Sequence, residues 1–268
     1  MFNTILVHPI FNLLAVLYAF VHDFGLAVVL LTIIIRGLLW PLVTRQLHSQ
    51  RALQELQPEL KRIKAEAAGD RTLEGKLTME LYKEREINPF ASFLPLLIQL
   101  PIFLALFIVL KDIVKAGEIA KVAYEPVKHL PAIAEIINHH ATFKPTLFGV
   151  IDLTKTSPIL AVLAGLVQFI QTKQIAPKNQ GGDAQAQMMA GMTYVFPALT
   201  FFIGLSLPGA LPLYWFTSSA MAVIQQHIVL NRDVRELEEG TPTPAKAIAK
   251  PAAPAPHRGH KSKGKRKK

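Results

Sequence analysis

The chain has 268 residues, of which 51% are hydrophobic, and it carries 29 lysines and arginines against 19 acidic residues. Its hydrophobic residues gather in long runs and its charges fall between them, which is the pattern of a polytopic membrane protein and not of a soluble basic one. The absence of cysteine excludes disulfides, cysteine-ligated metals and a thiol nucleophile.

The first apolar run, residues 5–21, has one clearly apolar helical face. It is either a short spanning helix or an amphipathic helix that lies in the membrane interface. No lysine or arginine precedes Arg36, so nothing holds this end in the cytoplasm. We therefore predict that residues 1–22 form an external interfacial amphipathic helix.

Residues 23–43 form the first predicted span, and a charged segment, residues 44–90, follows it. This segment holds nine lysines or arginines and eight acids, and its leucines recur at three- and four-residue steps. The spacing predicts a cytoplasmic helical hairpin, with Gly69 ending the first arm and Thr72 as N-cap of the second. Pro58 should interrupt the first arm. The alternative is a solvated linker.

Residues 91–230 are predicted to hold spans two to five. These spans are expected at residues 90–110, 158–172, 188–207 and 211–230, with a polar connector at 174–187 and a tight turn at 208–210. The segment between the second and third spans, residues 111–156, is an external loop. It contains His139 and His140, but adjacent histidines on a helix diverge and no carboxylate sits at ligand spacing. We expect no metal and no cofactor.

The C-terminal segment, residues 231–268, is predicted to be a disordered basic cytoplasmic tail. Its candidate contacts with ribosomal RNA or anionic lipid are Arg258, Lys261, Lys263, Lys265, Arg266, Lys267 and Lys268. Five spans place the two ends on opposite sides, and the positive charge follows the last span. The N-terminus is therefore expected outside and the C-terminus in the cytoplasm.

Arg36 interrupts the first span. A guanidinium at bilayer depth costs about 2.5 kcal/mol or more. Seven residues, about 10 Å of helix, separate Arg36 from the predicted cytoplasmic end of its span, so one interpretation is snorkelling to the headgroups. However, Thr32 lies one turn earlier on the same face, and no span has an acid in its middle. An unpaired cation among neutral polar residues favours a water-filled cavity open to the cytoplasm.

Such a cavity would serve one of two purposes. It could conduct or transport an anion that binds Arg36, or it could receive polar parts of another polypeptide and lower the cost of moving them across the membrane. The sequence shows no Ser-His-Asp set, no carboxylate pair within a span and no glycine-rich phosphate loop, so we do not expect an enzyme.

Several motifs occur in a fixed order along the chain. They are Leu31–Pro41, Gln57–Leu60 with Ile63 and Lys64, Asn88–Pro89, Leu94–Phe103, Phe148–Leu153, Phe196–Pro197, Leu207–Trp215 and Gln225–Gln226. Together they resemble the YidC/Oxa/Alb family of membrane protein insertases, in the short bacterial form without a large periplasmic domain. The resemblance implies an all-α polytopic membrane protein with five transmembrane helices around a hydrophilic groove, in the bacterial inner or plasma membrane.

The resemblance also implies a function. Members of the family insert membrane proteins and help them to fold, Sec-independently or with the Sec translocon. The implied partners are nascent membrane proteins, the ribosome, the Sec translocon and anionic lipids, but not DNA. The hairpin would recruit substrates and the tail would contact ribosomes. The candidate groove residues are Arg36, Thr32, Gln99, Gln168, Trp215 and Tyr214. An anion channel or transporter that uses Arg36 as its binding charge is the alternative.

Overall fold

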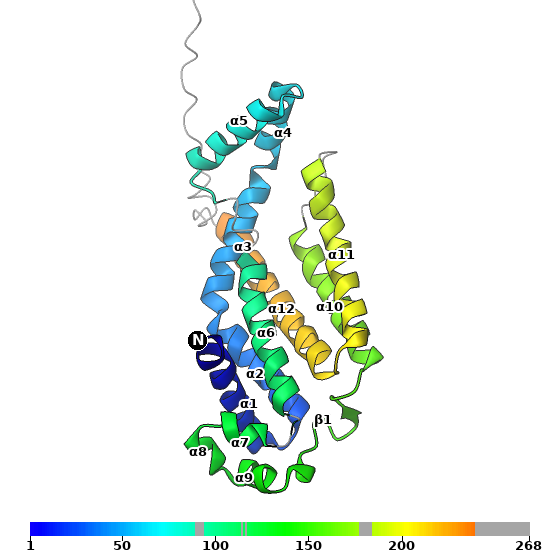
Figure 1. Ribbon diagram of the computed structural model, residues 1–268. Coiled ribbons are helices and arrows are strands. Elements are labelled where there is room, and N and C mark those ends of the chain that lie inside the picture. Colours follow the sequence, from blue (N-terminus) through cyan, green and yellow to red (C-terminus); the bar gives the residue numbers. More distant parts are fainter. Residues whose placement is uncertain (89–93, 114, 116, 177–183, 239–268) are drawn as a thin grey trace, which may run out of the picture.

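The computed structural model describes residues 1–88, 94–113, 115, 117–176 and 184–238 (Figure 1). The elements are η1 (Asn3–Val7), α1 (His8–Val21), α2 (Phe24–Leu38), α3 (Trp40–Glu55), α4 (Gln57–Ala67), α5 (Arg71–Glu84), α6 (Leu94–Ile113), α7 (Glu118–Val122), α8 (Glu125–Lys128), α9 (Pro131–Asn138), η3 (His140–Thr142), β1 (Thr146–Leu147), β2 (Ile151–Asp152), α10 (Pro158–Ile175), α11 (Ala184–Ser206) and α12 (Ala210–Glu238). The predicted all-α class is confirmed. The two strands form a small antiparallel β-hairpin.

The long helices run between two ends of different character. Figure 1 shows the helical hairpin α4–α5 at one end, hereafter the charged end, and α7 to α9 with β1 at the other, hereafter the loop end. Helix α12 packs on α2 and α10, and α10 packs on α11. The outer surface of α10 and α11 is apolar. Its exposed side chains include Ile159, Val162, Leu163, Leu166, Ile170, Tyr194, Val195, Leu199, Phe202 and Ile203.

The N-terminal segment is one continuous helix, Asn3–Val21, made of η1 and α1. Its length and composition are sufficient to cross a membrane, as the spanning alternative requires. It packs against α2, α6 and the loop-end helices. The buried Asn12 side chain joins it to the loop end, since Nδ2 donates to the Val122 carbonyl at 3.1 Å and Oδ1 accepts from Tyr124 N–H at 2.6 Å.

The first predicted span is not a single straight helix, so that prediction is wrong in detail. Helix α2 ends at Leu38, and α3 begins at Trp40 after a bend of 62°. Pro41 explains the bend, because it has no N–H to donate to the carbonyl of Gly37 and its ring crowds that carbonyl. Helix α3 then runs to Glu55, through the predicted boundary between the span and the charged segment.

Few of the described helices are both long enough and apolar enough to cross a membrane. Besides Asn3–Val21, the bent pair α2–α3 qualifies if it is counted as one span, and Thr193–Ser206 is a shorter apolar helix. These are results for the part of the chain that the structure describes. The number of five spans stays a prediction.

The charged segment forms a helical hairpin from α4 and α5. Pro58 lies in the first turn of α4, and the first arm is interrupted there. Ala68 and Gly69 both have positive φ, 47° and 97°, and reverse the chain. The N-cap of α5 is Asp70 and not Thr72, because the Asp70 carboxylate accepts from the N–H groups of Thr72 (2.9 Å) and Leu73 (3.1 Å). Thr72 is already inside the helix.

A small core packs the second arm of this hairpin against the end of α3, with Leu60 and Ile63 of α4 packed beside it, and an ion pair joins the two arms. The core consists of Ala52, Leu56, Leu81, Tyr82 and Ile87. Arg85 donates from Nη2 to both carboxylate oxygens of Glu59, at 3.0 and 2.9 Å. The core includes Ala52 and Leu56, which belong to the α3 side of the Pro58 break, so the hairpin is fixed to α3.

Because Asp70 and not Thr72 is the N-cap, substitutions at these two residues should differ in their effect on stability. Asp70→Ala should lower the free energy of unfolding of the hairpin by about 1 kcal/mol, because two N–H groups of α5 lose their acceptor. Thr72→Ala should change it by less than about 0.5 kcal/mol. Amide hydrogen exchange in α5 measures both. Equal loss of protection in the two variants would contradict the assignment of the cap.

The C-terminal helix is longer than predicted. Helix α12 continues to Glu238, so residues 231–238, predicted as part of a disordered tail, are helical. The reason is local, since no glycine or proline interrupts this segment before Gly240 and its residues are mostly good helix formers. The rest of the predicted tail, with the basic residues from Arg258 to Lys268, lies outside the described residues, as do residues 177–183 of the connector 174–187.

Candidate functional site around Arg36

The interior of the helix bundle changes from apolar to polar along its length. On the loop-end side, buried apolar residues of α1, α2, α6 and α12 form one core. On α2 the buried members of this core extend no further than Leu31, on α12 no further than Tyr214, and on α6 they begin at Ala105. Toward the charged end, buried polar side chains occur beside a few buried apolar ones such as Leu47, Ala222 and Val229. Among the described residues these polar side chains are those of Thr32, Gln46, Thr193, Thr217, Ser218, Ser219, Gln225 and Gln226. The apolar core lies on their loop-end side.

Arg36 lies at the start of this polar region and is held by neutral groups. Its guanidinium donates from Nε to Ser218 Oγ at 2.9 Å, and Nη2 donates to the same oxygen. Nη2 also contacts Gln99 Oε1 at a longer 3.5 Å. Gln99 in turn donates from Nε2 to Tyr214 Oη at 2.6 Å. Helices α2, α6 and α12 thus meet in one hydrogen-bonded cluster: Arg36, Gln99, Tyr214 and Ser218.

Among the described residues, no acid neutralises the charge of Arg36. Its hydrogen-bond partners there are the neutral groups of Ser218 and Gln99. Part of the compensation comes from the helix itself. Because α2 ends at Leu38, Arg36 lies in the last turn, where the helix dipole favours a cation by about 0.3–1 kcal/mol. The site therefore keeps a net positive charge in a partly buried position.

The three other predicted groove residues, Gln168, Trp215 and Thr32, make separate contacts. Ser219, the neighbour of Ser218, donates to Gln168 Oε1 at 2.8 Å and so joins α12 to α10. Trp215 stacks on Phe103 of α6, with ring centroids 5.2 Å apart and an interplanar angle of 6°. Thr32 is buried, but its hydroxyl donates to the Val28 carbonyl at 2.7 Å and not to Arg36.

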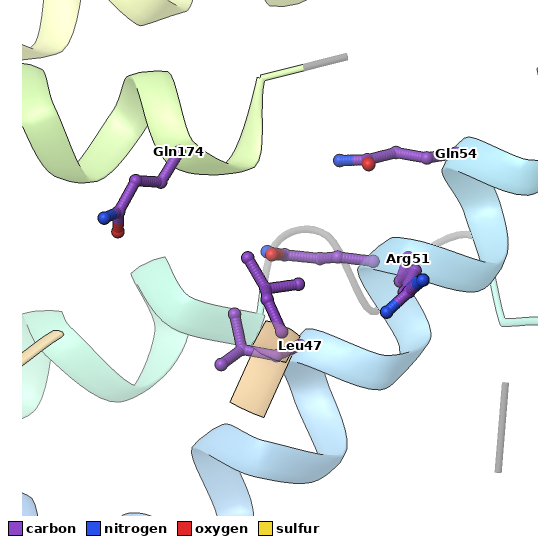
Figure 2. A pocket seen from close by; sticks show the side chains of 6 residues that line it. Leu47, Arg51, Gln54 and Gln174 are labelled. Atoms are coloured by element: carbon purple, nitrogen blue, oxygen red, sulfur yellow. The ribbon is translucent and has the colours of Figure 1, made fainter. Parts of the chain in front are cut away.

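The polar interior continues past the bend between α2 and α3. Gln225 is almost fully buried, and its Nε2 donates to the carbonyl of Trp40 at 3.1 Å. Further on, a small pocket of about 20 Å³ lies between α3 and the ends of α10 and α12, with room for about one water molecule. Figure 2 shows Gln174 on one side of it and Leu47, Arg51 and Gln54 on the other. Amide side chains thus recur between the Arg36 cluster and the charged end.

Ser218 is the site residue that we did not select from the sequence. It was one of many polar residues in the apolar runs, and a serine alone carries little signal. The spacing on α12 would have identified it, because Tyr214, Ser218 and Gln225 recur at four and seven residues and share a face. Which residues on α2 and α6 this face meets is decided by helix packing.

Comparisons with known proteins agree with the motifs. A family model described as 60Kd inner membrane protein matches residues 16–236. A Fusobacterium nucleatum relative named membrane protein insertase YidC is 33% identical over 231 residues, which cover 83% of this chain and 98% of the relative. Relatives with the same name from Shewanella halifaxensis and Methylobacillus flagellatus are each 32% identical over 82% and 83% of the chain. The chain spans only 36% and 35% of those two proteins.

Proposed function

The chain belongs to the 60Kd inner membrane protein family, that of the YidC/Oxa/Alb insertases, and from this premise we propose that it inserts membrane proteins and assists their folding. The observation that carries the proposal is Arg36, which has no carboxylate partner among the described residues and is held by neutral side chains next to the apolar core. Insertion takes place Sec-independently or together with the Sec translocon. The substrates are nascent membrane proteins, and the ribosome is a partner.

The polar interior lowers the cost of moving a polar segment into the membrane. A peptide group or hydroxyl that enters hydrocarbon without a hydrogen-bond partner costs several kcal/mol. Between the charged end and Arg36, the same group meets amide and hydroxyl side chains such as Gln99, Ser218 and Gln225. The apolar core beyond Leu31 lies on the loop-end side of this interior.

Arg36 adds an attraction for acidic segments. A substrate with a short acidic segment brings the carboxylate that Arg36 lacks among the described residues. The pair forms where water is partly excluded, so it is screened less than a surface pair. The apolar span of the substrate then partitions into lipid, and the burial of about 20 apolar residues drives the step without a nucleotide.

The proposed orientation of the protein in the membrane fits this route for the substrate. We place the loop end outside, and α4–α5 and the basic tail in the cytoplasm. The α4–α5 hairpin is charged, lies at the charged end of the molecule and is suited to receive substrates. The basic residues of the tail suit ribosomal RNA, and anionic lipid is the competing partner for the same charges.

Anion transport through the same cavity is the alternative use of Arg36. The names of the relatives do not favour it. It requires substrate-dependent anion flux into vesicles that contain the purified protein alone, and this flux should disappear in Arg36→Ala.

Site-specific photo-crosslinking tests the insertase proposal. A photoreactive residue at Trp215 or Gln168, both half-buried beside the Arg36 cluster, should form adducts with a single-span membrane protein during its synthesis. The matched control is Phe202 on α11, which is 64% exposed on the outer apolar surface. Adducts at Trp215 and Gln168 but not at Phe202 support the polar route. Absence of adducts at Trp215 and Gln168 would contradict it.

A further inference from the structure

The β-hairpin at the loop end carries two apolar side chains that the described part of the chain leaves exposed. Its loop consists of Phe148, Gly149 and Val150, between the paired residues Leu147 and Ile151. Leu147 is buried, but Phe148 is 73% exposed and Val150 is 83% exposed. Two such residues at the tip of an ordered hairpin require an explanation, because the site around Arg36 does not use them.

One side of the hairpin is fixed to the start of α2. Asp23 is the N-cap of α2, since Oδ1 accepts from Leu26 N–H at 2.8 Å. Its other oxygen, Oδ2, accepts from the N–H of Phe148 at 2.6 Å. The same carboxylate therefore joins the helix and the hairpin tip. Leu147 also packs directly on Gly25, where a Cβ would lie only 2.6 Å from the Leu147 Cβ.

The backbone at the tip is also held in an uncommon conformation. Phe148 has φ 53° and Gly149 has φ 68°. For a residue with a bulky side chain the left-handed region costs about 1–2 kcal/mol, so the Asp23 hydrogen bond and the strand pairing must maintain it. They hold the Phe148 side chain in its exposed position.

The chain that leaves the hairpin is pinned to the turn between α11 and α12. Gly209 N–H donates to the Lys155 carbonyl at 2.8 Å, and Ala210 N–H donates to the Leu153 carbonyl at 3.1 Å. Thr156 pairs with Pro208. These hydrogen bonds fix the position of the hairpin. Its tip lies at the level where α2 and α10 begin and where α11 is followed by α12.

This level is also where the apolar outer surface begins. Ile159, in the first turn of α10, is already 67% exposed, and Val162 and Leu166 continue the same surface. Lysines lie close in sequence on both sides of the tip, Lys144 and Lys155. The Lys155 side chain is 80% exposed and forms an exposed ion pair with Asp152 at 3.2 Å. Apolar and aromatic residues flanked by lysines are typical of the boundary between acyl chains and phosphate headgroups.

We propose that Phe148 and Val150 insert into the acyl–headgroup boundary of the lipid leaflet at the loop end. Through Asp23 the tip then fixes the depth of the start of α2. Phe24 to Arg36 is about 18 Å of helix, and the hydrocarbon core is about 30 Å thick. The anchor thereby sets how deep Arg36 lies. The proposal rests on the membrane location of the family and not on insertase activity.

The lack of native cysteine makes a direct test possible. Val150→Cys carries a single nitroxide label in the full-length protein, reconstituted in phosphatidylcholine–phosphatidylglycerol vesicles. Collision rates with oxygen, which concentrates in acyl chains, and with a nickel chelate, which stays in water, report immersion. Val162→Cys is the lipid-facing control. Glu125→Cys, whose side chain is 77% exposed on α8, is the aqueous control.

The label at Val150 should show an oxygen-to-nickel collision ratio several-fold above that at Glu125 and close to that at Val162. A ratio equal to that at Glu125 would overturn the proposal, as would shielding from both reagents, which indicates a protein partner. In Phe148→Ser, a label at Ile33 on α2 should change its depth. An unchanged Ile33 label would overturn the control of α2 depth, whether or not the protein inserts substrates.

Discussion

Arg36→Ala should slow the insertion of single-span proteins with acidic external segments about tenfold or more. At an effective dielectric constant of about 20, two opposite charges 4 Å apart attract by about 4 kcal/mol. If the activation free energy of the rate-limiting step rises by about a third of that attraction, the rate falls about tenfold. Insertion into inverted membrane vesicles, followed by protease protection of the translocated segment, measures the rate.

Three comparisons separate charge from structure in this experiment. Arg36→Lys keeps the charge and should retain part of the activity, although lysine cannot reproduce the paired donation to Ser218. Ser218→Ala keeps the guanidinium and should cost less than Arg36→Ala. A substrate whose external segment is neutral should be nearly insensitive to Arg36→Ala. If the alanine variant inserted acidic and neutral substrates at wild-type rates, Arg36 would have no role in insertion.

Loss of folding is not expected to explain the result. Arg36 is a partly buried charge held by neutral groups, and such a charge is a weak source of stability. Its replacement by leucine should therefore leave the thermal midpoint unchanged or raise it, while insertion falls. If a substitution stabilises the protein but impairs insertion, the original residue is retained for function and not for stability.

Gly25→Ala should lower the free energy of unfolding by about 1–3 kcal/mol. The added Cβ would lie 2.6 Å from the Cβ of Leu147 and 2.9 Å from its Cα, so backbone must move and not only a flexible side chain. Overpacking of this kind costs an amount in that range. Thermal unfolding in detergent, followed by tryptophan fluorescence, measures the shift.

Gly37, on the same helix, provides the matched control. A Cβ added there meets nothing within 4 Å, so Gly37→Ala should be neutral or stabilise α2 by up to about 1 kcal/mol. The prediction for Gly25 would be wrong if both variants unfolded at the wild-type temperature. A loss at Gly25 together with a displaced Val150 label would show that the contact also positions the β-hairpin.

Local patterns predicted much of the helical architecture. Apolar runs located the long helices because each run is long enough to be recognised without its partners. Pro58 and Gly69 marked the helical hairpin because their backbone preferences are local. The N-cap was assigned to the wrong residue because Asp70 and Thr72 are both good caps and only the backbone geometry distinguishes them. The end of α12 was missed because charge was taken as a sign of disorder.

The sequence by itself determined that Arg36 is a charge in an apolar run, that no span has an acid in its middle, and that the chain carries the motifs of its family. Only the tertiary structure decided which neutral groups hold Arg36. Ser218, Gln99 and Tyr214 lie 63 to 182 residues away along the chain and meet Arg36 through the packing of α2, α6 and α12. The bend at Pro41 also placed Arg36 in a last helical turn. The physical reason is that burial and hydrogen bonding depend on contacts between helices, whereas helix formation depends mainly on neighbours in sequence.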